Sequence, residues 1–150
     1  MNDPAERLRA VLSETVPQLK LASEEDGGRD RGDGKWVRKE ILGHLIDSAL
    51  NNHQRFVRVQ VVDRLIWPGY DGDAWVVIHR YKERRWSDLV ELWSTVNYHL
   101  AHLISSVAPE HLAKQCVIGS GNSVTLEWLM GDYVEHLCHH VDQILDREVK

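Results

Sequence analysis

Hydrophobic residues recur every three or four positions in four long stretches of the chain, which is the spacing of an amphipathic helix. The clearest stripe is in the third stretch, where Leu89, Trp93, Val96 and Leu100 follow one another at helical intervals. We expect Trp93 and Trp128 to anchor the core. The predicted helices cover residues 5–22, 36–65, 87–107 and 126–145. Four such helices predict an all-α protein built as a four-helix bundle.

The helix ends are marked by breaking and capping residues. Pro68 and Gly69 end the second predicted helix. Ser87 can cap the third helix, and either Ser123 or Thr125 can cap the fourth, because their hydroxyls accept hydrogen bonds from the first free backbone N–H groups. These signals place the connections as well as the helices.

The connections differ in character. Residues 23–34 are polar and glycine-rich, so we expect a flexible loop. Residues 70–85 predict an irregular crossover with one or two helical turns, and residues 110–124 predict a loop with a small β-like excursion. No internal repeat is visible, and 150 residues is the usual length of one domain, so we expect a single domain over 1–150.

Composition and charge exclude several classes of protein. The formal net charge of −5 argues against a nucleic-acid-binding protein, which normally carries a basic face. No apolar run approaches the roughly twenty residues that span a bilayer, and the first residues do not resemble a signal peptide. Two cysteines, Cys116 and Cys138, are too few for a disulfide framework. We therefore expect a cytoplasmic protein with no membrane or nucleic-acid partner.

Two histidines occupy the apolar stripe of the fourth predicted helix. His136 and His140 are one turn apart, where leucines are expected. Buried imidazoles need partners for their ring nitrogens, and a pair at i and i+4 can share a metal ion. Position 137 is Leu rather than the Glu of the zinc-protease helix, which argues against that chemistry. A catalytic metal site of this type needs a third protein ligand.

Helical phase leaves the third ligand open. His44 lies at the boundary of the core face of the second predicted helix and is a good candidate, while His99 and His102 flank the core stripe of the third. Cys138 is two residues from both histidines of the pair, so it faces away and cannot join them. The plainer alternative is that the histidines are core residues satisfied by hydrogen bonds.

Two segments resemble a known family. WVRKEILGHLIDSALNNHQRF (36–56) and VTLEWLMGDYVEHLCHHVDQIL (124–145) are similar to the second and fourth helices of the DinB-like, YfiT-type family of metal-dependent hydrolases. The resemblance implies an up-down-down-up bundle, usually a homodimer, with one divalent transition metal ion such as zinc or nickel. It also implies that the metal ligands are His44, His136 and His140. Relatives include enzymes that use low-molecular-weight thiols.

These ligands lead to a hypothesis about function. Three neutral imidazoles leave a metal its full charge, which favours either a hydrolase or a low-molecular-weight-thiol S-transferase acting on a small-molecule substrate. Asp47 and Asp132 are each one turn from a candidate ligand and are candidates for orienting it or for a general base, and Gln143 is a candidate for a supporting hydrogen bond. The alternative for each aspartate, which is favoured for either alone, is a solvated carboxylate on a helix face, and the alternative for Gln143 is a boundary residue. The catalytic residues are unknown. The alternatives are a non-catalytic metal-binding or stress-response bundle protein, and a bundle whose apolar face serves dimerisation.

Overall fold

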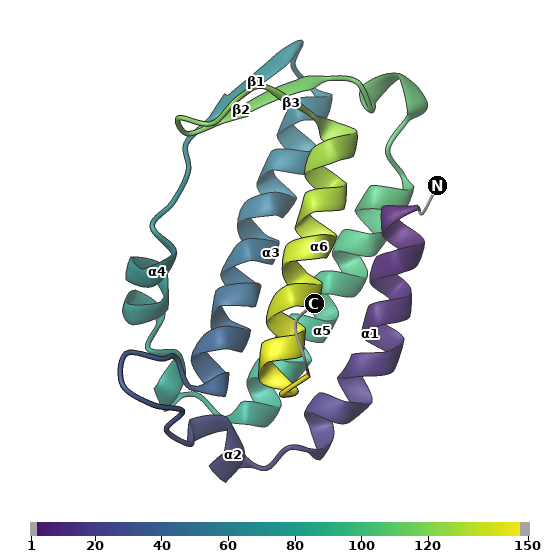
Figure 1. Ribbon diagram of the computed structural model, residues 1–150. Helices are drawn as coiled ribbons and strands as arrows, with labels where there is room; N and C mark the ends of the chain where they lie inside the picture. The colour runs from purple at the N-terminus through teal and green to yellow at the C-terminus, as the bar shows by residue number, and fades with distance from the viewer. Residues whose placement is uncertain (1–2, 148–150) are drawn as a thin grey trace.

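Four long helices pack side by side in the computed structural model, which describes residues 3–147 (Figure 1). The first and last helices run in one direction and the middle two in the other. The helices are α1 (Pro4–Leu21), α3 (Arg38–Gln60), α5 (Trp86–Ser105) and α6 (Leu126–Ile144). The predicted four-helix bundle is therefore confirmed, with the up-down-down-up order.

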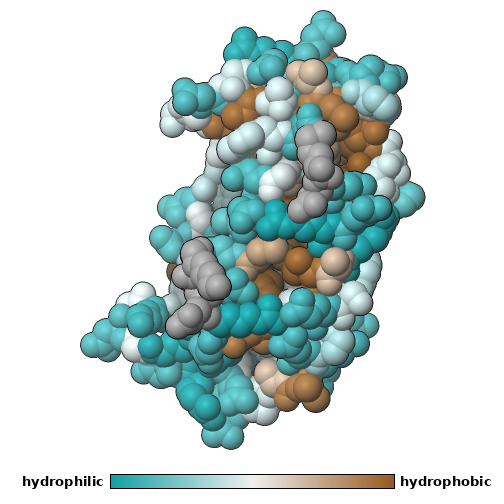
Figure 2. All heavy atoms as spheres, turned by 45° about the vertical axis from the view of Figure 1, so that its right-hand side comes forward, coloured by the Kyte–Doolittle hydropathy of each residue, from teal (hydrophilic) through white to brown (hydrophobic). Residues whose placement is uncertain are grey.

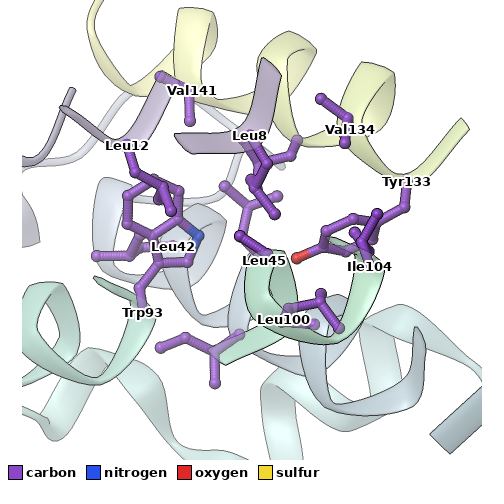
Figure 3. Close-up of a cluster of buried hydrophobic side chains, with 14 of the residues drawn as sticks. Leu8, Leu12, Leu42, Leu45, Trp93, Leu100, Ile104, Tyr133, Val134 and Val141 are labelled. Carbon is purple, nitrogen blue, oxygen red and sulfur yellow. The ribbon is translucent and has the colours of Figure 1, made fainter. Parts of the chain in front are cut away.

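The core draws on all four long helices. Trp93 is fully buried in it, as its place in the apolar stripe predicts (Figure 3). Trp128 does not anchor the core, because it lies one position before the buried Leu129 and is 55% exposed. One position turns a side chain by about 100° around a helix axis, which here points the indole towards solvent. The other core side chains labelled in Figure 3 include Leu8, Leu12, Leu42, Leu45, Leu100, Ile104, Val134 and Val141.

The caps of the last two helices differ from each other. Thr125 caps α6, because its Oγ1 accepts a hydrogen bond of 3.1 Å from the backbone N–H of Trp128. Ser87 does not cap α5, which begins one residue earlier, at Trp86. The indole of Trp86 is buried and donates to the carbonyl of Leu19 at 2.7 Å. This tertiary contact draws the start of α5 into the bundle without a side-chain cap.

The polar connection at 23–34 is not wholly a loop, because it begins with the short helix α2 (Glu24–Gly28). Ser23 caps this helix by accepting from the N–H of Asp26 at 3.0 Å. A Cβ atom at Gly27 would lie 3.0 Å from the ring of Trp86, so glycine allows the close approach of the helix to α5. The apolar pattern cannot reveal α2, because its contact with the core is made by a glycine.

The second predicted helix ends at Gln60 rather than at Leu65. Leu65 belongs instead to β1 (Arg64–Trp67), which pairs in parallel with β2 (Gln115–Ile118). A third strand, β3 (Val124–Thr125), is antiparallel to β2. The small sheet lies across one end of the bundle (Figure 1). It confirms the β-like excursion before α6, whereas β1 could not be expected from helical periodicity.

The crossover between α3 and α5 carries a two-turn helix, α4 (Gly72–His79), and a 3₁₀ turn over Tyr81–Glu83. It returns along the outside of α3 (Figure 1). The ring of Tyr81 lies directly on Gly43, where a Cβ atom would be only 2.1 Å from the ring. This contact holds the crossover against the part of α3 that carries His44.

The surface is largely polar on the face drawn in Figure 2, where hydrophobic residues form separate areas between hydrophilic ones. Some individual hydrophobic side chains are well exposed, and Ile66, Val77 and Ile78 are each more than 70% exposed. Among residues 3–147, no helix is both long enough and apolar enough to cross a membrane.

Candidate metal centre

Three imidazole rings from two helices meet between α3 and α6. The Nε2 atom of His136 lies 3.4 Å from Nε2 of His44 and 3.1 Å from Nε2 of His140. The candidate ligand atoms of all three residues lie within 4.8 Å of one another. The structure therefore brings together the three histidines that the family resemblance implied. Helical phase alone had selected two of them, His136 and His140.

The helices account for this convergence. His136 and His140 are one turn apart on α6, so their side chains emerge on the same face. α3 runs antiparallel to α6 and packs against it. His44 is partly buried on its flank, at the boundary position that its helical phase predicts. The ring of Trp36 lies against His44, with ring centroids 5.0 Å apart.

The geometry fits a single divalent ion. A tetrahedral ion bound at about 2.0–2.1 Å separates its ligand nitrogens by roughly 3.3 Å, close to the 3.1 and 3.4 Å between the Nε2 atoms. The group contains three imidazole nitrogens and, within residues 3–147, no carboxylate or thiol. Zinc and nickel accept imidazole ligands readily. Three protein ligands leave a coordination position free for water or substrate.

The electrostatics of the cluster favour neutral rings. Burial, reinforced by the neighbouring imidazoles, lowers the pKa of His44 and of His136 to about 4. Burial also lowers the pKa of His140. Neutral imidazoles have lone pairs available for a metal at neutral pH. In addition, Nδ1 of His44 is buried and has no hydrogen-bond partner within the described residues.

Gln143 supports one of the three rings. Its Oε1 lies 2.7 Å from Nδ1 of His140, so this nitrogen donates the hydrogen bond. The neutral ring then has its lone pair on Nε2, which is the atom facing His136. The supporting hydrogen bond considered for Gln143 from its position on the helix is thus present, and it fixes both the tautomer and the direction of the ring.

Asp47 does not orient His44, although it is one turn away. Its carboxylate is fully buried; Oδ1 accepts a hydrogen bond of 2.6 Å from the hydroxyl of Tyr81 and lies 3.2 Å from Nδ1 of His79. Burial raises the pKa of Asp47. Asp47 was only a candidate for this role, and the crossover supplies its nearer partners instead. No pattern in the sequence signals that the crossover folds back there.

The remaining candidates lie apart from the cluster. Asp132 is exposed and makes no hydrogen bond to an imidazole among residues 3–147. Cys138 faces away from the histidines, as its helical phase predicts, and its surroundings include Arg7 of α1. Cys116 is fully buried in β2. Both cysteines are free thiols.

Two cavities flank the histidine cluster. One of about 480 Å³ is lined by His140, Gln143 and Trp36 together with basic residues of the loop before α3. The other, of about 170 Å³, lies between α3 and α6 on the side of His136. A further hollow of about 580 Å³ between α1, α2 and α5 contains none of the three histidines. Small molecules can therefore approach the cluster from two sides.

Comparisons with known proteins agree with this picture. The chain is 26% identical over 141 residues to YfiT of Bacillus subtilis (strain 168). This alignment covers 91% of this chain and 79% of YfiT. The solved structure of YfiT, a probable metal-dependent hydrolase with an unusual four-helix bundle topology, matches 95% of this chain and 82% of its own, with a TM-score of 0.82 and 22% identity. A mycothiol-dependent maleylpyruvate isomerase matches 93% of this chain and 58% of its own, with a TM-score of 0.74 and 13% identity.

The same assignment follows from the sequence pattern of the family. The model of the DinB superfamily matches residues 6–144, which includes all four long helices except the first two residues of α1. The two helices that carry the histidine cluster are matched over their full lengths. This chain belongs to the DinB superfamily.

Proposed function

We propose that His44, His136 and His140 bind one divalent transition metal ion, zinc or nickel, and that the protein is a metal-dependent enzyme acting on a small molecule. One observation carries the proposal: three Nε2 atoms converge with no fourth ligand among the described residues, between two cavities. An ion held by three neutral imidazoles lowers the pKa of bound water from 15.7 to about 7, or deprotonates a bound thiol.

The chain's own residues perform three tasks in this proposal. The histidines stay neutral at pH 7 because burial lowers their pKa values, so they hold the metal without adding charge. Gln143 keeps the His140 lone pair directed inwards. Trp36 covers one side of His44 and shields that ring from water. No described side chain is placed for general-base work by a hydrogen bond to the cluster, so a metal held by the three histidines would have to supply the activation of the nucleophile.

Hydrolysis is the leading reaction, and thiol S-transfer is the second. The likeness to YfiT, a probable metal-dependent hydrolase, supports hydrolysis. Thiol transfer is supported by the likeness to a mycothiol-dependent isomerase and by the cavity of about 480 Å³ beside His140, which has room for a second small molecule. In both reactions the same three histidines would hold the metal, and the reactions would differ in the nucleophile, which would be water for hydrolysis and a thiol for S-transfer.

The test is a paired activity screen of protein loaded with zinc or nickel. One arm measures the cleavage of small esters and amides, and the other measures the conjugation of a thiol to an electrophile. The His140→Ala variant and chelator-treated protein serve as controls. We expect activity in one arm that both controls abolish. Equal rates in the wild type and His140→Ala would overturn the proposal.

The alternative is a non-catalytic metal-binding or stress-response bundle. A fourth protein ligand would favour it by closing the coordination sphere, and residues 3–147 provide none near the cluster.

We further propose that the protein is a homodimer in the cytoplasm. The exposed hydrophobic residues of the crossover, Val77 and Ile78, support association, and the two free thiols support a reducing compartment. Light scattering with and without chelator measures the mass and its dependence on metal.

A further inference from the structure

Two cationic side chains are buried among residues 3–147, and they differ in their partners. The amino group of Lys39, which is 6% exposed, pairs with the carboxylate of Glu24. Arg55 is 9% exposed, and its guanidinium has no carboxylate oxygen within 4.0 Å in the same part of the chain. Burying an unpaired charge reduces the free energy of unfolding by roughly several kcal/mol. The position of Arg55 therefore calls for a partner that the described residues do not supply.

The donors of this guanidinium are largely unused. Nη1 makes a long contact of 3.5 Å with Oδ1 of Asn52, and Nε is buried without any acceptor in the described part of the chain. The ring of Tyr70 lies 5.8 Å from the guanidinium carbon, which steadies the plane of the group without using its N–H bonds. A guanidinium has five N–H donors in a rigid fork, suited to two oxygens of one anion.

The same guanidinium lines a cavity that reaches the histidine cluster. This is the cavity of about 170 Å³ between α3 and α6, and His136 forms part of its wall. The only other charged group on its wall, among the described residues, is the carboxyl of Asp132. The remaining polar side chains of the wall are neutral: Ser48, Asn52, Tyr70 and Tyr133. An unpaired cation and a candidate metal ligand thus face one small polar space.

We propose that Arg55 binds the carboxylate of a small acidic substrate whose reacting group lies beside His136. The two oxygens of a carboxylate match the fork of the guanidinium. A single cation balances the single negative charge of a carboxylate but not the double charge of a phosphate dianion, and the carboxyl of Asp132 on the same cavity wall disfavours the more highly charged anion. The inference of a reaction rests on the function proposed above, but carboxylate binding by Arg55 does not.

The test compares butyrate with butyramide, which has nearly the same shape and no charge. Calorimetric titrations at constant ionic strength use metal-free and metal-loaded protein. We expect wild-type protein to bind butyrate at least ten-fold more tightly than butyramide. Arg55→Met should abolish this preference, and Arg55→Lys should keep only part of it, since an ammonium lacks the fork. The matched control is Arg58→Met, one turn along α3, which removes the same charge from an exposed side chain and should keep the preference.

Each other outcome overturns the inference. Equal affinity of the wild type for butyrate and butyramide does so without any variant, even if Arg55→Met fails to fold. Tighter binding of inorganic phosphate than of butyrate overturns the assignment to a carboxylate, and an equal loss in Arg58→Met overturns the role of Arg55. The His140→Ala variant separates the two proposals: it should lose metal but retain the preference for butyrate.

Discussion

Tyr133 and His136 are one turn apart on α6, and both direct polar atoms into the bundle, yet their surroundings differ. The hydroxyl of Tyr133 donates to Oδ1 of Asn97 at 2.6 Å, and the amide of Asn97 donates in turn to the carbonyl of Trp93 at 2.9 Å. Tyr133 and Asn97 are almost completely buried. Nε2 of His136 instead faces the Nε2 atoms of two other imidazoles, and His44 has a buried Nδ1 with no partner within residues 3–147.

The difference separates structural from functional polar groups in one core. Each polar group of the Tyr133–Asn97 pair has a partner inside the protein, so the pair adds to the stability of the fold. The three imidazoles cannot all satisfy one another, because each neutral ring has one donor and one acceptor and all three present Nε2 to the same point. A protein retains such an arrangement at a cost, and a bound cation removes that cost.

Replacing a histidine of the cluster should have the largest effect on metal binding and little effect on folding. We expect His140→Ala to reduce bound metal from about one ion per chain to nearly none, because two ligands hold a divalent ion weakly. Elemental analysis after dialysis measures the stoichiometry, and circular dichroism checks the fold. Tyr133→Phe is the matched control on the same helix and should keep its metal. Loss of metal in both variants would contradict the division between the two regions.

Much of the cluster was open to prediction from the sequence, because it lies on regular helices. Spacing alone placed His136 and His140 on one face of α6. Phase could not choose His44 from the other histidines, since the choice depends on how α3 packs against α6, and the family resemblance supplied it. Arg55 was missed altogether. The only signal in the sequence was the position of Arg55, a charged residue directly before Phe56. The side chain of Phe56 is fully buried in the core.

The parts of the fold that escaped prediction depend on contacts between distant residues. The first two residues of β1 were assigned to a helix, because the pairing of β1 with β2 joins segments about fifty residues apart. The partners of Asp47 were unforeseen for the same reason, since Tyr81 and His79 reach it only when the crossover folds along α3. Periodicity reports which face of an element is buried, but not which element covers that face.

A smaller loss of metal affinity should follow from removing the support of one imidazole. Gln143→Leu deletes the acceptor for Nδ1 of His140 and leaves all three metal ligands in place. Loss of such a supporting hydrogen bond typically weakens metal binding by about 10–100-fold. Competition with a chelator of known affinity measures the change. Gln143→Glu, which keeps an acceptor, should retain most of the affinity. If Gln143→Leu binds metal as tightly as the wild type, the hydrogen bond has no role in the site.

Breaking the Tyr133–Asn97 pair should lower the stability of the fold rather than the affinity for metal. Tyr133→Phe leaves Oδ1 of Asn97 buried without its donor, which should cost about 1–3 kcal/mol of unfolding free energy. Chemical denaturation of metal-free protein measures this cost. Tyr98→Phe removes the hydroxyl of a tyrosine that is 45% exposed and should change stability by less than about 0.5 kcal/mol. Equal stability of the two variants would show that the pair at Tyr133 is not a structural element.

The smallest expected effect is a pH dependence that distinguishes the two regions in the metal-free protein. The folded pKa of His136 is about 4, below the ordinary value of 6.5, so the unfolded chain binds more protons between these values. Stability should therefore be highest above about pH 6.5 and should fall as the pH drops towards 4. His136→Leu removes this titration and should reduce the loss of unfolding free energy between pH 7 and 5.5 by on the order of 1 kcal/mol.

Tyr133→Phe should keep the wild-type dependence of stability on pH, because a phenol does not titrate in that range. Thermal melts of the three proteins at matched pH values provide the comparison, and parallel curves for His136→Leu and the wild type would mean that the imidazole is not held neutral by the fold.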